Sequence, residues 1–99
     1  MIKLVTWEMD RTHTSTDPAE RMKHTLMMCE MVKKNMTSGT LKMWGLNPGG
    51  NSGFGISGAD EKEIFAMAAQ YIPYVKFKVE PMLEIDDVIS TLKKAQQQT

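Results

Sequence analysis

The segment Leu41–Ser57, LKMWGLNPGGNSGFGIS, predicts two short strands joined by a turn. Leu41–Leu46 is the first strand, and Phe54–Ser57, in which Phe and Ile alternate with Gly and Ser, is the second. The connection Asn47–Gly53 holds a proline and three glycines, and a helix does not continue through such a run. The segment therefore predicts a hairpin in the middle of the chain.

One helix and one further strand are predicted on each side of this hairpin. Toward the N-terminus, Ile2–Met9 alternates like a strand, and Asp17–Met36 repeats apolar residues at helical spacing. Toward the C-terminus, Asp60–Tyr71 predicts a helix, Val75–Met82 a strand, and Glu84–Gln97 a short terminal helix. Strand, helix and strand thus occur twice in succession. This is the α+β, ferredoxin-like βαββαβ arrangement, here with a C-terminal helix.

The first helix has the clearest start signal in the chain. Asp17 can accept hydrogen bonds from the first free N–H groups, and Pro18 stands where its missing N–H costs nothing. Glu20 completes an acidic variant of the capping box. Gly39 suits a left-handed cap at the other end of the helix.

Periodicity also predicts which side chains are buried. The apolar stripe of the first helix comprises Met22, Leu26, Cys29, Val32 or Lys33, and Met36. The inward side of the second helix comprises Ile64, Phe65, Met67, Ala68 and Tyr71. In the last strand we expect Val75, Phe77 and Val79 to face the core. Cys29 is expected to be a small, buried apolar residue.

Size and charge restrict the function. Ninety-nine residues correspond to one domain, residues 1–99, with enough apolar residues for one modest core. Twelve basic and twelve acidic residues cancel. This balance argues against nucleic acid, which needs a basic face, and against electrostatic docking on a membrane. It also leaves self-association unopposed by charge repulsion.

The sequence predicts a soluble protein. The start MIKLVT is typical of a strand rather than a signal peptide, and no apolar run approaches the roughly 20 residues that span a bilayer. Cys29 is the one cysteine, so no disulfide can form within the chain. We therefore expect a reducing, cytoplasmic location.

The hairpin region resembles a family of uncharacterised small bacterial and phage proteins. The similarity lies in Met43-Trp44-Gly45, Gly49-Gly50 and Gly53-Phe54-Gly55-Ile56, followed by acidic residues that open a helix. Val5-Thr6-Trp7 is similar to the first strand of that family. The resemblance implies the dimeric α+β barrel superfamily, with a four-stranded antiparallel sheet of order 4-1-3-2, helices on one face, and a homodimer that packs two sheets face to face. The family has no assigned function, so no catalytic residue carries over.

Two patterns that suggest cofactor or metal chemistry fit poorly. Gly53–Gly58 matches G-x-G-x-x-G, but Phe54 and Ile56 alternate as in a strand, and the carboxylates that open the next helix would repel a phosphate. His24 and Cys29 lie five residues apart, which aligns them poorly on a helix for shared coordination. We expect no cofactor and no bound metal.

The candidate site residues are few. His13, in the loop after the first strand, is the one candidate acid or base, and no catalytic residue is assigned. Trp7, Met22, Leu26 and Trp44 are candidates for a pocket that holds a small apolar ligand. For the two tryptophans the alternative is packing in the core or at a subunit interface.

Two functions stay open. The first is a homodimeric domain that binds a small apolar molecule or interacts with another protein, without an evident catalytic apparatus. The second, implied by the resemblance, is a cofactor-independent monooxygenase- or isomerase-like enzyme acting on an apolar or aromatic molecule. A cavity between sheet and helices that contains His13 or another titratable group would favour the enzyme.

Overall fold

The computed structural model of the protein describes residues 2–98 and contains one antiparallel sheet. Its strands are β1 (Ile2–Met9), β2 (Met43–Leu46), β3 (Ser52–Ser57) and β4 (Val75–Met82). They lie in the order β2-β3-β1-β4, which is the predicted order 4-1-3-2 read from the other edge. The ferredoxin-like topology is therefore confirmed.

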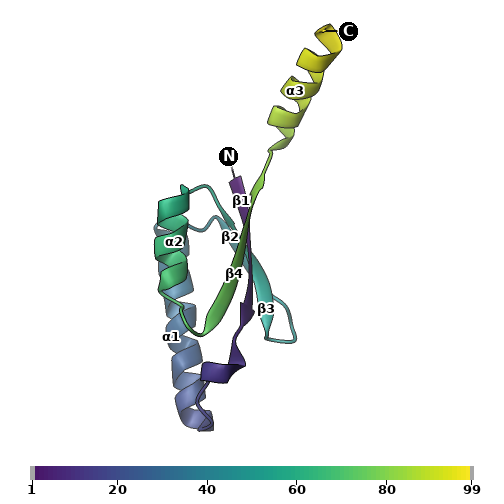
Figure 1. Cartoon of the computed structure of the whole chain (residues 1–99). Coiled ribbons are helices and arrows are strands. Elements are labelled where there is room, and N and C mark those ends of the chain that lie inside the picture. Colours follow the sequence, from purple (N-terminus) through teal and green to yellow (C-terminus); the bar gives the residue numbers. More distant parts are fainter. Residues whose placement is uncertain (1, 99) are drawn as a thin grey trace.

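Two helices cover one face of the sheet, and a third lies apart (Figure 1). The covering helices are α1 (Pro18–Thr37) and α2 (Glu61–Ala69). Helix α3 (Ile85–Gln97) continues from the end of β4 and projects beyond the sheet. Because of this projection the protein is 64 Å long but only 25 Å by 21 Å in cross-section.

The helix termini follow the local sequence closely. The carboxylate of Asp17 accepts a hydrogen bond from the N–H of Ala19, and Pro18 begins α1. Glu20 does not close the predicted capping box, because its carboxylate accepts a hydrogen bond from the Ser15 hydroxyl instead. Gly39 adopts the expected left-handed conformation after α1, with φ of 85°.

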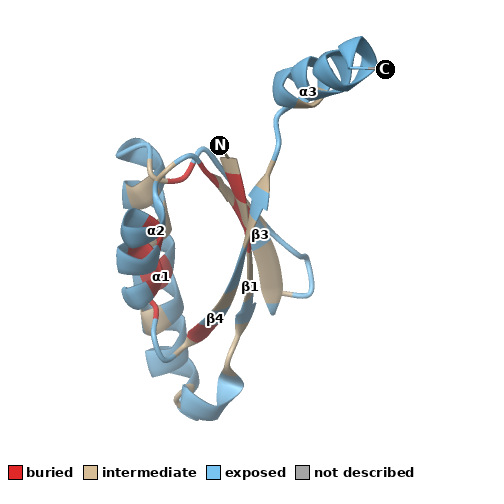
Figure 2. Cartoon of the chain, turned by 45° about the horizontal axis from the view of Figure 1, so that its top comes forward, coloured by how far each residue is buried: buried red, intermediate tan, exposed pale blue. Residues whose placement is uncertain are grey.

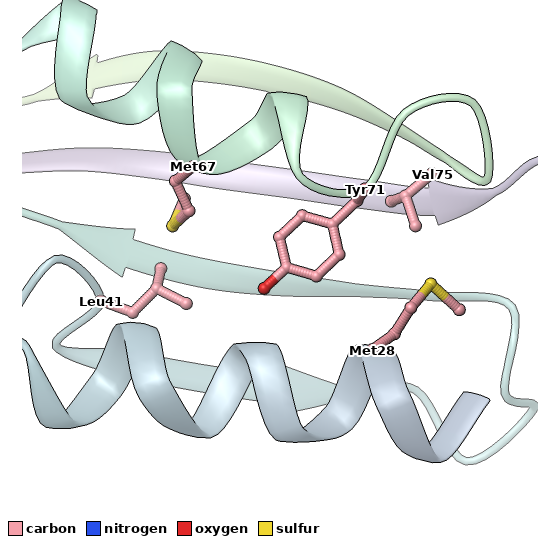
Figure 3. Packing of buried hydrophobic residues seen from close by; sticks show 5 residues of the cluster. All are labelled: Met28, Leu41, Met67, Tyr71 and Val75. Atoms are coloured by element: carbon pink, nitrogen blue, oxygen red, sulfur yellow. The ribbon is translucent and has the colours of Figure 1, made fainter. Parts of the chain in front are cut away.

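A buried apolar cluster joins the helices to the sheet (Figure 3). It comprises Met28, Leu41, Met67, Tyr71 and Val75. Leu41 belongs to this cluster and not to a strand, since β2 begins only at Met43. Figure 2 shows that the buried residues concentrate between the helices and the sheet, whereas α3 is largely exposed.

Helix α1 is rotated relative to the predicted stripe. The half-buried or buried positions in its central part are His24, Met28, Met31, Val32 and Asn35. Met22, Leu26 and Met36 are exposed, and Cys29, expected to be buried, is exposed as well. Because each residue turns a helix by about 100°, a stripe centred on Met28 leaves these positions facing solvent.

Two other expected core residues are also exposed. Phe65 is 68% exposed because α2 buries the side that carries Ile64, Met67 and Ala68. Val79 pairs with the buried Val5 across the sheet, but it lies on an edge strand and is exposed. Val75 and Phe77 face the helices as predicted.

The tryptophan pair on this face depends on Gly53 of β3. Trp7 lies opposite Gly53 and Trp44 opposite Gly55 in the strand register. A Cβ atom at position 53 would come within 2.5 Å of the Trp7 indole and would also collide with the backbone carbonyl of Gly45. The absence of a side chain at Gly53 thus leaves room for the Trp7 ring. This ring stacks on that of Trp44, with centroids 5.6 Å apart at 11°. The G-x-G-x-x-G match is therefore part of a strand that admits an aromatic pair.

The variant Gly53→Ala is expected to lower the melting temperature by several degrees. A Cβ that collides with backbone cannot be relieved by moving a flexible side chain, and overpacking of this kind costs about 1–3 kcal/mol. Thermal unfolding followed by circular dichroism measures the change. Gly49→Ala is the control, because its Cβ would meet only the Asn47 Oδ1 atom at 3.6 Å. Equal melting temperatures for the two variants would contradict the steric role of Gly53.

Candidate functional site

A cavity of about 150 Å³ lies between the helix-facing side of the sheet and helices α1 and α2. Its walls are predominantly apolar and aromatic, and the aromatic residues in them are Trp7, Trp44, Tyr71 and Phe77. Met28, Cys29 and Val32 contribute the wall from α1. A concave space of this kind, lined by aromatic side chains with few polar groups, is typical of small-molecule sites.

Tyr71 brings one polar group into the buried cluster. Its hydroxyl accepts a hydrogen bond of 2.9 Å from the Asn35 amide, whose nitrogen also donates to Gln70. Burial raises the pKa of the Tyr71 phenol, and the opposing effect of the Asn35 hydrogen bond is smaller. The hydroxyl therefore stays protonated at neutral pH and is available as a donor.

Trp7 has a polar atom without a partner. Its Nε1 atom is fully buried and makes no hydrogen bond within the described chain. A buried donor left without an acceptor costs roughly 1–3 kcal/mol. The stacked position of Trp7 over Gly53 is thus held by packing rather than by polar contacts.

Arg11 supplies the one formal charge among the residues that line the cavity within the described chain. It lies in a short 3-10 turn, η1 (Arg11–His13), directly after β1. Its guanidinium donates to Asn51 Oδ1 from Nη2 at 2.6 Å and from Nε at 3.2 Å. Asn51 belongs to the hairpin between β2 and β3, so two loops hold the cation at the cavity.

The structure separates the four residues predicted to line a pocket. Trp7 and Trp44 line the cavity and stack on each other. Met22 and Leu26 are 61% and 57% exposed on α1 and do not line it. The sequence reasoning missed Val32 and Phe77 as lining residues, although the alternation of β4 had placed Phe77 on the inner side.

His13 lies at a different hollow. This second hollow, of about 200 Å³, is lined by His13, Ser15, Glu20, Arg21, His24 and Tyr74, among others. The rings of His24 and Tyr74 meet there with centroids 4.0 Å apart. Met9, Thr25 and Met28 border both spaces, but His13 borders only the second. The structure thus does not bring His13 and the tryptophan pair into one site.

Residues 2–98 contain no side-chain cluster suited to a metal ion and no helix suited to crossing a membrane. No group of three or more His, Cys, Asp or Glu side chains there is placed to hold a metal ion. None of the helices described there combines the length and the apolar character needed to cross a membrane.

Comparison with known proteins identifies the family. No curated protein matches the sequence. One family model, described as Domain of unknown function (DUF3303), matches residues 1–96. That range includes the whole sheet, both covering helices and the residues that line the cavity. The protein belongs to the DUF3303 family.

Proposed function

We propose that this protein binds a small, largely apolar molecule in the cavity between the sheet and helices α1 and α2. The observation that carries the proposal is the space beside the stacked Trp7 and Trp44. Its volume of about 150 Å³ is close to what a protein cavity needs to admit one benzene-sized ring. The aromatic walls offer such a ring dispersion and edge-to-face contacts.

The position of His13 removes the one candidate acid or base from the cavity, but the cavity holds other titratable groups, so the enzymatic alternative stays open beside binding. A cofactor-independent monooxygenase or isomerase was expected to have His13 or another titratable group at its cavity. His13 borders the second hollow instead, and the titratable groups at the cavity are Arg11, Cys29 and Tyr71. The Tyr71 hydroxyl, with its raised pKa, is suited to donate a hydrogen bond but not to act as a base near neutral pH.

We further propose that the protein is a homodimer of the dimeric α+β barrel type. Helices α1 and α2 cover only one face of the sheet (Figure 2). The opposite face carries Leu4 and Ile56, with Phe54 37% exposed and Met43 55% exposed beside them. The same face carries Lys76, Lys78 and Glu80 on β4. A second copy would cover the apolar part of this face, and a net charge of zero opposes such pairing little.

Helix α3 adds a second apolar surface to the proposed dimer. Four large apolar residues are exposed in the C-terminal arm, the segment from Leu83 to the end of α3: Leu83, Ile85, Ile89 and Leu92. The last three follow helical spacing on one side of α3. Amphipathic helices are stable mainly when their apolar side is packed. We propose that α3 packs on the second copy. A cytoplasmic location is also proposed, supported by the free thiol of Cys29.

The cavity proposal predicts saturable binding of a neutral aromatic compound such as indole. Val32→Phe fills the cavity wall and is expected to weaken binding at least tenfold. Leu26→Phe makes a similar change on the exposed side of α1 and is expected to leave binding unchanged. Two-dimensional NMR of the two tryptophan indole N–H groups reports the titration. Absence of binding to the wild type, or equal binding by Val32→Phe, would refute the proposal.

The dimer proposal predicts a solution mass of about twice 11.2 kDa. Phe54→Glu places a charge on the uncovered face and is expected to give a monomer in analytical ultracentrifugation. Phe65→Glu, at a more exposed position on α2, is expected to remain dimeric. If the wild type is a monomer at about 100 μM, or if Phe54→Glu remains a dimer, the protein does not pair through this face.

The proposed role of α3 is tested by Leu92→Glu. Because this change interrupts the apolar side of the arm, it is expected to raise the dimer dissociation constant about tenfold or more. Ser90→Glu, on the other side of the same helix, is expected to have little effect. Sedimentation equilibrium measures both constants. If the two variants dissociate alike, α3 does not contribute to the interface.

A further inference from the structure

We infer that the cavity is selective for a small aromatic monocarboxylate, whose ring enters the apolar space and whose carboxylate meets Arg11. This inference rests on the proposed binding function and adds the chemical class of the ligand. It follows from three properties of the cavity: the charge of its lining, the way Arg11 is held, and its size.

The described residues that line the cavity carry positive charge without any negative charge. The residues that border the cavity include Arg11 but no Asp, Glu, Lys or His among those that the structure describes. The ion pairs within the described chain are Lys3–Glu61 and Lys78–Glu80, so no carboxylate of that part of the chain neutralises Arg11. The nearby Asp10 is engaged instead with the N–H and hydroxyl of Thr12. The lining therefore favours an anion over a neutral or cationic compound.

The guanidinium is held in place by a neutral partner. Asn51 Oδ1 accepts from Nε and Nη2, which leaves the N–H groups of Nη1 and the second N–H of Nη2 without a protein acceptor that the structure records. Arginine offers its donors as a planar fork that matches the two oxygens of a carboxylate. Since Asn51 is uncharged, its contact orients the cation without neutralising it. Arg11 is thus prepared for an incoming carboxylate.

The size of the cavity limits the apolar part of the ligand. About 150 Å³ accommodates a single six-membered ring. Trp7, Trp44, Phe77 and Tyr71 surround this space, and aromatic walls favour a flat ring over a branched aliphatic chain. Arg11, two residues beyond the end of β1 at Met9, borders the same space, so a carboxylate on a short tail of the ring can face it.

A matched pair of compounds tests the inference. 3-Phenylpropionate carries the ring and the anion, and 3-phenylpropan-1-ol is its neutral analogue. We expect the wild type to bind the acid about three- to tenfold more tightly than the alcohol, the range typical of an exposed charge pair. Isothermal titration calorimetry, with NMR of the indole N–H groups to place the compounds, measures both constants. The preference is expected to shrink as salt rises from about 20 to 500 mM.

The variant Arg11→Gln distinguishes the contribution of the Arg11 charge to binding from that of the apolar cavity. It is expected to weaken binding of the acid about three- to tenfold more than binding of the alcohol, so that the preference for the acid is lost. Arg21→Gln is the control, because Arg21 borders the second hollow and not the cavity. The control variant is expected to retain the wild-type preference.

The outcomes distinguish the two proposals. If neither compound binds up to about 10 mM, the proposed binding function fails and the inference fails with it. If both bind equally well, or if Arg11→Gln keeps the preference for the acid, the cavity binds ligands but Arg11 does not select an anion. A preference that is lost in Arg21→Gln as well would also overturn the role of Arg11.

Discussion

The arrangement of the site depends on the close approach of Trp7 to the backbone of β3. An indole ring can lie there because Gly53 has no side chain, and Trp44 then stacks on it from β2. The stacked pair forms an aromatic surface on the helix-facing side of the sheet. Helices α1 and α2 pack beside this surface through Met28 and Met67 and leave the cavity next to it. The missing side chain of Gly53 thus helps to shape the cavity, because it allows the Trp7 ring to lie against β3.

The two faces of the sheet have unequal environments. One is covered by α1 and α2, and the other presents Leu4, Ile56 and Phe54 without a cover from the described chain. The projecting α3 also has an uncovered apolar side, since it contacts little of the sheet and of the two covering helices (Figure 1). Burial of apolar area is the main stabilising term in folding and association. A second copy, as proposed, would bury both surfaces in one step.

Much of the fold could be predicted because its signals are local. The N-cap at Asp17, the turn at Gly39 and the alternation in Val75–Met82 depend on neighbours in sequence. The structure confirms the first two, and it confirms the alternation as far as Phe77, whereas Val79 is exposed. The face of α1 could not be predicted, because methionines and other apolar residues occur on all its sides. Periodicity selects a face only where the other faces are polar. The stripe through Met22 and Leu26 was therefore wrong, and with it the expected burial of Cys29.

By itself the sequence determined the order of strands and helices along the chain and the hairpin, because capping, turn and pleat geometry act over a few residues. Only the tertiary structure decided which side chains meet at the cavity. Trp7 and Trp44 are 37 positions apart, and Arg11 and Asn51 are 40 apart, so no local rule connects either pair. Strand pairing brings them together, since β3 lies between β1 and β2 and its Gly53 leaves space for the Trp7 ring.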